Sequence, residues 1–389
     1  MTRIVFTEAG SNPGDLFPFT LTRKAQDIRL GIFTIRQKWE HHLGLTSFDN
    51  SGEHKTKPEH LLPEGLPGKE MIYLIRGNSL PSKNMASQVK KLRPGEALSL
   101  PDETPFLHYL SVEQLRNGAG LSAKKVPIIE EVKVLQFPWE IFAMNKWALE
   151  QDFSFVRKKR KSNSISRTNK VVNEKNVFLE KGCSVEHCLI NATEGPVYIG
   201  KNALVMEGTM LRGPVSIGEG AVVKMGARIY GATTVGPFCT VGGEIKNSVI
   251  FAYSNKAHDG YLGDSVLGEW CNLGAGTSNS NIKNSASDIK VHTPSGNKLV
   301  GTKCGLLMGD YSRSAINTSF NTGTVVGTCS NVFGTGLSPN YIPSFSWGSD
   351  GARYNYDKAI KHVKNWKALK QQTLTAHDAS VLESIYNYH

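Results

Sequence analysis

The sequence predicts a Rossmann-like α/β domain, followed by a left-handed parallel β-helix of hexapeptide repeats and a C-terminal helical segment. Three observations support this fold class. Apolar residues recur every six positions between 197 and 245, strand-like and helix-like patterns alternate before residue 150, and the apolar spacing becomes helical after 354.

The six-residue repeat predicts the β-helix. Branched aliphatic residues hold every recurring position: Ile199, Val205, Leu211, Ile217, Val223, Ile229, Val235 and Val241. An α-helix would turn residues at this spacing through 600° and scatter them over all its faces. Short strands that meet at tight corners, each with one apolar side chain pointing into a prism, do produce this period. In hexapeptide proteins such coils wind left-handedly, contrary to the usual right-handed crossover.

Two stretches interrupt the repeat, at 247–260 and 279–297. We interpret both as loops that leave the prism, and we expect the repeat to return at 299–301 and to persist to about 333. Loops on a rigid repeat scaffold are where binding and catalytic residues concentrate. The first interruption is therefore the main candidate for the functional site.

Residues 1 to about 150 alternate between strand and helix patterns. We expect strands at 4–6 and 71–75, and helices from about 31 to 43, from 84 to 92 and after Trp139. Such alternation favours a parallel sheet with a pocket beyond the carboxyl ends of its strands. The loop at 9–15 lacks the glycine spacing and the lysine of a phosphate-binding loop, so a polar turn is the simpler interpretation.

The predicted domains are 1–155, the α/β domain; 156–170, a basic linker; 171–340, the β-helix; and 341–389, the helical extension. The linker is placed where the composition turns basic and rich in serine, without periodic apolar residues.

Composition limits the classes of partner. The net charge is +11, but much of the excess positive charge lies at 157–161 and in the C-terminal segment. A solvated linker, or a rim that attracts phosphate, explains this better than nucleic-acid binding.

The sequence has no run of eighteen apolar residues and no signal-peptide start, so we expect a cytoplasmic protein without a membrane partner. The six cysteines show no metal-ligand spacing, and we expect buried thiols.

The motif KAHDGYLGD at 256–264, followed by CNLGAGT at 271–277, resembles the acetyltransferase half of the bifunctional bacterial enzymes that make UDP-N-acetylglucosamine. The resemblance is dense over 227–277, and the repeat extends it to about 336. Enzymes of that family acetylate glucosamine-1-phosphate on a β-helix and uridylylate the product on an N-terminal nucleotidyltransferase domain. The resemblance thus implies a transferase of nucleotide-sugar biosynthesis that uses acetyl-CoA and assembles as a homotrimer.

The resemblance assigns a role to each residue that matches by position. His258 matches the general base, because an imidazole with a pKa near neutrality can take the proton of an attacking amine. Glu244 matches a carboxylate that orients the base or the amine. Cationic and polar positions that hold the sugar phosphate, the sugar and its amine are matched by Arg228, Lys246, Tyr261, Asn272 and Asn281.

The coenzyme positions depart from the family in part. Ala275 matches the strip along which acetyl-CoA lies, but a serine of that groove is replaced by Asp310, whose charge would face a polyanionic ligand. Two further family positions hold Ile282 in place of tyrosine and Ser287 in place of lysine. The second interruption is therefore where acetyl-CoA binding or acceptor specificity would have changed.

The N-terminal domain departs further, since it is shorter than the family's nucleotidyltransferase domain and lacks the glycine-rich signature after the first strand. A shorter group of sugar nucleotidyltransferases shares the pattern of 21–32, which makes Arg23, Asp27 and Arg29 the candidates for binding UTP or dTTP. A structural ion-pair network is the alternative. Asn78 and Asn145 match metal-ligand positions, although asparagine is a weaker Mg²⁺ ligand than aspartate.

Three functions stay open at this point. The leading one is an acetyl-CoA-dependent N-acetyltransferase acting on an amino-sugar phosphate, with glucosamine-1-phosphate as the expected acceptor. The second is Mg²⁺-dependent nucleotidyl transfer to a sugar-1-phosphate, with the β-helix serving to form a trimer. The third is a non-catalytic scaffold or a sugar-nucleotide sensor.

Overall fold

The computed structural model describes residues 2–48, 62, 65–117 and 123–388. They form two compact units. Unit 1 comprises 1–16, 23–28 and 33–136, and unit 2 comprises 17–22, 29–32 and 137–389. Residues from 137 onward and two short N-terminal segments thus group with the β-helix.

Unit 1 is built on a mixed five-stranded sheet. Its strands, in spatial order, are β1 (Arg3–Thr7), β4 (Met71–Arg76), β7 (Pro105–Ser111), β6 (Glu96–Ser99) and β8 (Lys124–Pro127). β7 runs antiparallel to both of its neighbours, whereas the β1/β4 and β6/β8 pairs are parallel. The strands β1, β4, β6 and β8 therefore run in the same direction, and their carboxyl ends lie at one edge of the sheet. We call this edge the carboxyl edge.

The helices of unit 1 begin at side-chain caps. They are α1 (Ile35–Leu43), α2 (Lys83–Val89) and α3 (Val112–Arg116). Thr34 and Ser111 each form a capping box with a glutamine three residues later, and Ser82 accepts from the amide of Met85. The helix expected from about 31 thus begins at 35, where the cap is available. The short strands β5 (Ser79–Leu80) and β9 (Lys133–Val134) pair beside them.

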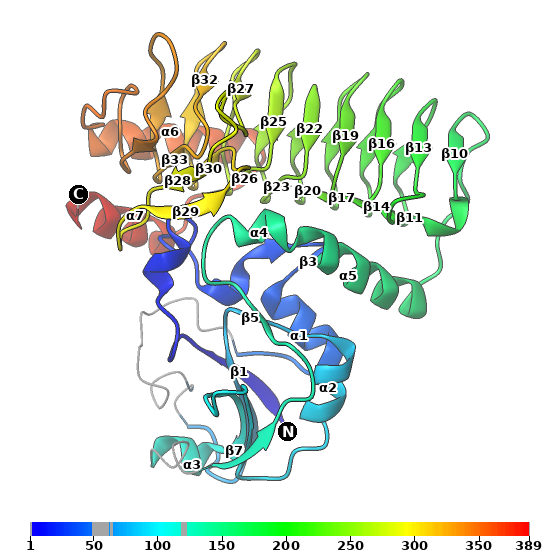
Figure 1. Ribbon diagram of the computed structural model, residues 1–389, viewed down its shortest axis with the longest axis vertical. Helices are drawn as coiled ribbons and strands as arrows, with labels where there is room; N and C mark the ends of the chain where they lie inside the picture. Colours follow the sequence, from blue (N-terminus) through cyan, green and yellow to red (C-terminus); the bar gives the residue numbers. More distant parts are fainter. Residues whose placement is uncertain (1, 49–61, 63–64, 118–122, 389) are drawn as a thin grey trace. The chain divides into compact units, whose positions relative to one another are not determined.

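Unit 2 is a parallel β-helix, which confirms the predicted fold class (Figure 1). The first sheet contains β10 (Lys170–Val172), β13 (Leu189–Asn191), β16 (Met210–Arg212), β19 (Arg228–Tyr230), β22 (Glu244–Lys246) and β25 (Tyr261–Gly263). The second contains β11 (Val177–Leu179), β14 (Val197–Ile199), β17 (Val215–Ile217), β20 (Thr233–Val235), β23 (Val249–Ile250), β26 (Val266–Leu267), β30 (Leu307–Met308), β33 (Val325–Val326) and β35 (Tyr341–Ile342).

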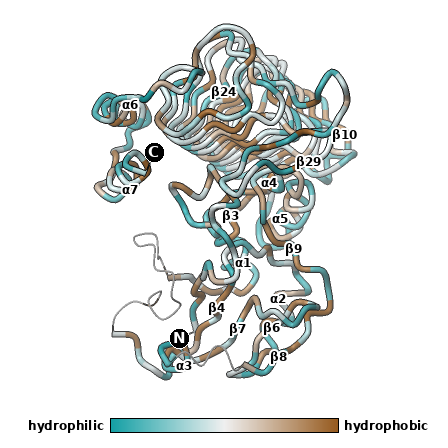
Figure 2. The backbone as a smooth tube through the Cα atoms, turned by 60° about the vertical axis from the view of Figure 1, so that its left-hand side comes forward, coloured by the Kyte–Doolittle hydropathy of each residue, from teal (hydrophilic) through white to brown (hydrophobic). Residues whose placement is uncertain are grey.

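The third sheet completes each coil. It contains β12 (Ser184–Val185), β15 (Leu204–Val205), β18 (Val222–Val223), β21 (Thr240–Val241) and β24 (Asn255–Lys256), and it continues through Asn272 to β31 (Arg313–Ser314) and β34 (Asn331–Val332). The eight repeat positions from Ile199 to Val241 are at most 1% exposed. They form one core with the small residues that face them, and brown hydrophobic stretches recur along the stacked coils in Figure 2. The prediction of an apolar prism is confirmed.

The first interruption is not a loop that leaves the prism, so that interpretation was wrong. Strands β23, β24 and β25 all lie within 247–263 and continue their sheets in register. Partners on neighbouring coils lie 15 or 17 positions apart here, whereas Arg212 and Glu194 are 18 apart. Shortened corners therefore shift the phase of the repeat without breaking the coil.

The second interruption is a true excursion. Leu306 bonds to Ser265, 41 positions away, so more than one additional coil length lies between them. The excursion carries the antiparallel hairpin of β28 (Ile289–Val291) and β29 (Lys298–Gly301). The expectation that the repeat returns at 299–301 was wrong, because Leu299 belongs to this hairpin and is 64% exposed. The repeat returns at β30.

Beside the excursion the first sheet opens. β27 (Ser278–Asn279) pairs with β32 (Ser319–Phe320), and side chains connect it to β25. The Ser278 hydroxyl accepts from the amide of Tyr261, while the Asn279 side chain both accepts from the amide and donates to the carbonyl of Gly263. Side-chain groups thus replace main-chain ladder bonds at this point.

N-terminal segments of unit 2 cover the outer face of the second sheet. α4 (Glu140–Ala143) and α5 (Asn145–Lys159) lie there, and the Thr234 hydroxyl donates to the carbonyl of Gly31. Phe19 packs on Phe251, with ring centroids 5.5 Å apart. The first residues of the predicted basic linker, 156–159, form the last turn of α5.

The corner between the second and third sheets adopts positive φ in successive coils. Asn202 and Gly220 hold this position in early coils, and in the next four coils it is held by aromatic residues: Phe238, Tyr253, Trp270 and Tyr311. Tyr253 stacks on Trp270 with centroids 4.3 Å apart and an interplanar angle of 1°. We call these four residues the aromatic corner.

The C-terminal helices α6 (Tyr356–Leu369) and α7 (Ala376–Tyr388) confirm the predicted helical extension, and they share a hydrophobic cluster with Trp270 and Tyr311. The Lys367 ammonium lies 4.7 Å from the ring centroid of Trp270. No helix in the described part of the chain combines the length and apolarity needed to cross a membrane.

Candidate functional site

The outer face of the first sheet brings four predicted residues together. Parallel pairing places Arg228, Glu244 and Tyr261 side by side in three successive coils, and Lys246 beside Tyr230 in a second column. Side chains two apart on a strand share a face, so both columns point outward from the prism. Their gathering follows directly from the coil register.

Glu244 is held by its neighbours on this face. The Tyr230 hydroxyl donates to Glu244 Oε1 at 2.7 Å, and Arg228 Nε lies 3.7 Å from Oε2. Burial, followed by this hydrogen bond to the carboxylate, raises the pKa of Tyr230 to about 12. Lys246 Nζ lies 5.9 Å from the Tyr230 ring centroid. Arg228 and Lys246 thus present cations near a carboxylate that is already engaged.

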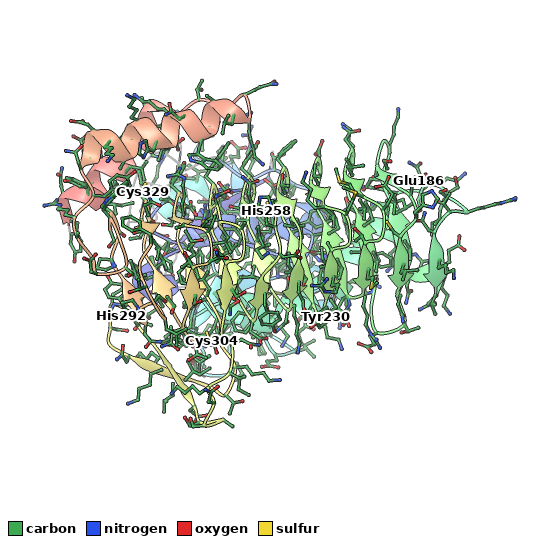
Figure 3. The ribbon with its side chains drawn as sticks, turned by 90° about the horizontal axis from the view of Figure 1, so that it is seen from above. Glu186, Tyr230, His258, His292, Cys304 and Cys329 are labelled. Atoms are coloured by element: carbon green, nitrogen blue, oxygen red, sulfur yellow. The ribbon has the colours of Figure 1, made fainter. Side chains whose placement is uncertain are left out.

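His258 lies at the corner between the third and first sheets, directly before Tyr261, and its side chain is exposed (Figure 3). Gly243 and Gly276 form the same corner in the preceding and following coils, with Gly276 donating to the carbonyl of Asp259. Alanine at Gly243 would place Cβ 2.7 Å from the His258 carbonyl oxygen, at a φ of +69°. The glycine therefore lets the corner of His258 pack closely against the coil before it.

Lys256 is the main residue of this region that the sequence reasoning missed. It pairs with Val241, takes the inward position of the column and is only 2% exposed. Its ammonium donates to the carbonyl of Gly242 at 3.1 Å and also to the carbonyl of His258. A lysine thus replaces an aliphatic core residue and ties the His258 corner to the preceding coil.

Burial lowers the pKa of Lys256 to about 8, with the Asp259 carboxylate opposing the shift. An ammonium in an apolar prism is costly unless it is hydrogen-bonded. The sequence did contain a signal for the inward position of Lys256. If the apolar residues 249–250 pair with the strand of Val235, then Lys256 pairs with Val241 in the next strand of the coil.

Tyr261 and Asn281 meet at a buried carboxylate. The Asn281 amide nitrogen donates to Asp264 Oδ2 at 2.5 Å and lies 3.3 Å from the Tyr261 hydroxyl, and Asn247 donates to Asp264 Oδ1 at 2.6 Å. Asp264 is 4% exposed. Because the nitrogen of Asn281 is engaged, its carbonyl oxygen is the end left to accept from an amine.

Asn272 lies on the third sheet, where its oxygen accepts from Asn255 at 3.4 Å. Ala275 forms the corner one coil after His258, and its carbonyl accepts from Asn317. Ile282 is 43% exposed, and Ser287 bonds to Ser285 in the excursion. The predicted acetyltransferase residues therefore lie at both ends of the first sheet. His258 and Ala275 lie where the third sheet meets the first, whereas Asn281 reaches Asp264 where the first sheet meets the second.

Asp310 lies at a different corner from Ala275. β26 pairs with β30, which places Asp310 after the second sheet, and Gly274 packs instead against Ala315 and Ile316. The Asp310 carboxylate is buried, with its oxygens accepting from the Thr22 hydroxyl at 2.6 Å and the Glu269 amide at 2.8 Å. The residue that follows Ala275 along its own corner is Ile316, which is 69% exposed.

The nucleotide candidates of the N-terminal sequence are engaged in structural contacts. Asp27 forms a two-pronged ion pair with Arg36, at 2.6 and 3.0 Å, and Arg36 also donates to Ser47 and to the Phe48 carbonyl. Arg29 donates to the carbonyl of Ile32 at 2.5 Å, and burial lowers its pKa. Arg23 lies in unit 1 with Asp27, whereas Arg29 lies in unit 2.

The residues present do not fit a Mg²⁺ site. Asn145 is fully buried, and its oxygen accepts from Gly31 at 2.6 Å and from Thr234 at 3.1 Å. Asn78 belongs to unit 1, where its nitrogen donates to the Leu135 carbonyl. Among the described residues no three His, Cys, Asp or Glu side chains gather as metal ligands.

Comparison with known proteins matches the N-terminal part of the chain to one family. Residues 4–161 match the family described as sugar nucleotidyl transferase. The matched stretch covers most of unit 1 and also α4 and α5 of unit 2.

Curated relatives of the chain are named as bifunctional proteins, and one of the names joins a nucleotidylyltransferase to an acetyltransferase. The chain is 28% identical to the bifunctional protein GlmU of Methanocaldococcus jannaschii over 49% of this chain and 41% of the relative. It is 27% identical to the bifunctional sugar-1-phosphate nucleotidylyltransferase/acetyltransferase of Sulfurisphaera tokodaii over 57% and 50%. The matched part of the chain thus spans half or less of these relatives, and the predicted resemblance is confirmed.

A solved structure of an Arabidopsis UDP-N-acetylglucosamine acyltransferase also matches, with 14% identity over 57% of this chain and 88% of that chain, at a TM-score of 0.28.

If Lys246 binds the phosphate of an amino-sugar phosphate, as the resemblance implies, replacing it by methionine should raise the KM for that substrate by about 10- to 100-fold, because a charge-assisted bond is lost. The kcat should stay within about twofold, and steady-state kinetics would measure both. Arg212→Met is the matched control, since Arg212 lies in the same column and pairs with Glu194 at 2.5 Å. An unchanged KM in Lys246→Met would remove Lys246 from the site.

Proposed function

We propose that this chain is an acetyl-CoA-dependent N-acetyltransferase that acts on an amino-sugar phosphate, with glucosamine-1-phosphate as the expected acceptor. The observation that carries the proposal is the band formed by Arg228, Glu244, Lys246 and Tyr261 beside the exposed imidazole of His258. The name of the Sulfurisphaera tokodaii relative, which includes an acetyltransferase, supports the same reaction class.

In this proposal Arg228 and Lys246 hold the phosphate, and the carbonyl oxygen of Asn281 orients the amine. When bound, acetyl-CoA supplies the acetyl group as a thioester. His258 accepts the proton that the amine nitrogen loses as its bond to the thioester carbon forms, and it returns that proton as the carbon–sulfur bond breaks and the thiol leaves. Lys256 keeps the His258 corner in place during both proton transfers.

The test is release of free thiol from acetyl-CoA, followed with a thiol-reactive dye in the presence of glucosamine-1-phosphate. Thiol release that depends on the amino-sugar phosphate would support the proposal. Glucose-1-phosphate is the control, because it carries the phosphate without the amine. Equal release with both compounds, or none with either, would refute amine acetylation.

We also propose a homotrimer. The outer face of the first sheet exposes Val172, Leu189 and Met210 by 53%, 43% and 49%, around a depression of ≈ 490 Å³ that extends to Arg228 and Tyr230. Contiguous exposed apolar surface of this kind fits packing against a second copy of the prism. A monomeric mass by native mass spectrometry would count against it.

A further inference from the structure

The carboxyl edge of the sheet in unit 1 gathers buried polar atoms that lack partners. Buried side-chain atoms without a hydrogen bond in the described part of the chain include Arg76 Nε, Asn78 Oδ1, Ser99 Oγ and Gln26 Oε1. Arg76 ends β4, Asn78 follows it, and Ser99 ends β6, so three of the four lie where parallel strands terminate. Native proteins leave few buried polar groups unpaired, so such a cluster needs an explanation.

Arg76 is the most informative member. It is 9% exposed, and no hydrogen bond or ion pair to its guanidinium is found among residues 2–48, 62, 65–117 and 123–388. Burial lowers the pKa of Arg76, and the solvent-exposed carboxylate of Asp102 opposes this shift. A guanidinium whose Nε is buried without a partner is costly, and an anionic ligand that accepts from it would remove that cost.

The backbone around Arg76 leaves room for its guanidinium. Gly10, in the loop after β1, has a φ of +75°, and a Cβ there would lie 2.7 Å from Arg76 Nη2. Gly77 would likewise bring a Cβ 2.6 Å from Gln26 Oε1. Gly10 and Gly77 both follow parallel strands that end at this edge. Ligands in sheets of this type bind beyond the carboxyl ends of the strands.

We propose that the carboxyl edge of unit 1 binds a phosphorylated small molecule directly through Arg76, without a metal ion. Arg76 takes the phosphate oxygens, and the unpaired oxygens of Asn78 and Gln26 accept from hydroxyl or amide donors of the same ligand. The guanidinium supplies next to Asn78 the positive charge that Mg²⁺ would supply in a metal-dependent site. This site is separate from the proposed acetyl-transfer site in the β-helix and does not depend on it.

The experiment is calorimetric titration of the full chain with UTP and, separately, with N-acetylglucosamine-1-phosphate, each in EDTA and in Mg²⁺. These two ligands distinguish a nucleotide from a sugar phosphate as the source of the phosphate. We expect one of them to bind with the same Kd in both media and to bind at least tenfold more weakly to Arg76→Met. Arg93→Met is the matched control, because Arg93 is exposed and precedes β6 at the opposite edge.

The variant Asn78→Asp makes the test sharper. Metal-free binding through Arg76 and binding through Mg²⁺ predict opposite changes in its affinity for phosphate. A carboxylate beside Arg76 would pair with the guanidinium and weaken phosphate binding several-fold, with or without Mg²⁺. Tighter binding of Asn78→Asp in Mg²⁺, or release of pyrophosphate by that variant, would overturn the proposal in favour of a metal site. Unchanged binding in Arg76→Met would also overturn it. Thiol release by these variants reports separately on the acetyltransferase proposal.

Discussion

Replacing His258 by alanine is expected to lower the kcat of acetyl transfer by about 10²- to 10⁴-fold, the usual contribution of a general base. The reason is geometric: His258 occupies the corner that leads into Tyr261, beside the cations of the first sheet. Its side chain is exposed, so the substitution should leave the folded structure intact. Thiol release from acetyl-CoA, together with the melting temperature, would measure both effects.

His187→Ala is the matched control. His187 is also an exposed histidine at the corner between the third and first sheets, but it lies between β12 and β13, near the start of the solenoid (Figure 3 labels its neighbour Glu186). We expect this variant to keep the wild-type kcat. Full activity in His258→Ala would remove the histidine from the mechanism while leaving the fold unaffected.

Replacing Lys256 by methionine is expected to lower kcat by about 10²-fold with little change in KM. Methionine fills the inward position but cannot donate to the carbonyls of Gly242 and His258, so the His258 corner loses its tie to the neighbouring coil. A displacement of about 1 Å at a catalytic group can have an effect of this size. Amide hydrogen exchange should become faster at 257–260, and unchanged exchange there would contradict the positioning role.

The same variant should reveal the titration of Lys256. In the folded protein the pKa of Lys256 is about 8, below the usual 10.5, because burial disfavours its charged ammonium form. This penalty is fully present below pH 8 and disappears as the pH rises toward 10.5. The free energy of unfolding of the wild type should therefore rise relative to Lys256→Met across that window, by up to about 3 kcal/mol. Urea unfolding of both proteins at pH 7, 8.5 and 10 would measure the difference, and parallel curves would contradict it.

Sequence reasoning predicted the prism because each coil repeats the same backbone path. A side chain every six residues then points inward regardless of its neighbours, as the burial from Ile199 to Val241 confirms. Arg228, Glu244 and Tyr261 were chosen from the resemblance, and the strand register places Arg228 beside Glu244 and Glu244 beside Tyr261. Periodicity thus predicted the prism, whereas the site residues needed the resemblance.

The predictions failed where the six-residue spacing of inward-pointing side chains changes. The stretch 247–260 resembled a loop because two corners are shorter, although the strands continue in register. Asp310 was matched to a serine of the coenzyme groove, but the strand pairing places it after the second sheet, and Ile316 lies at the corner that follows Ala275. Lys256 was missed because an interior charge contradicts the apolar rule on which the prediction rests.

The unpaired atoms at the carboxyl edge of unit 1 were beyond sequence reasoning for a different reason. The absence of a partner is a property of three-dimensional packing, and no pattern around Arg76 or Asn78 reveals it. The resemblance implies a metal-ligand position at Asn78, whereas the unpaired Nε of Arg76 is the basis of the proposed metal-free recognition of an anion.

The aromatic corner makes the late coils and the C-terminal helices dependent on each other during folding. Bulky side chains at positive φ are disfavoured by about 1–3 kcal/mol each, and stacking between Tyr253 and Trp270 offsets this only once the coils are assembled. Because α6 buries the outer surface of that stack, assembly of these coils and docking of the helix should occur as one cooperative step. A chain truncated before α6 should therefore lose order first in the coils that carry His258 and Asn272, and the early coils, with Asn202 and Gly220 at this corner, should persist.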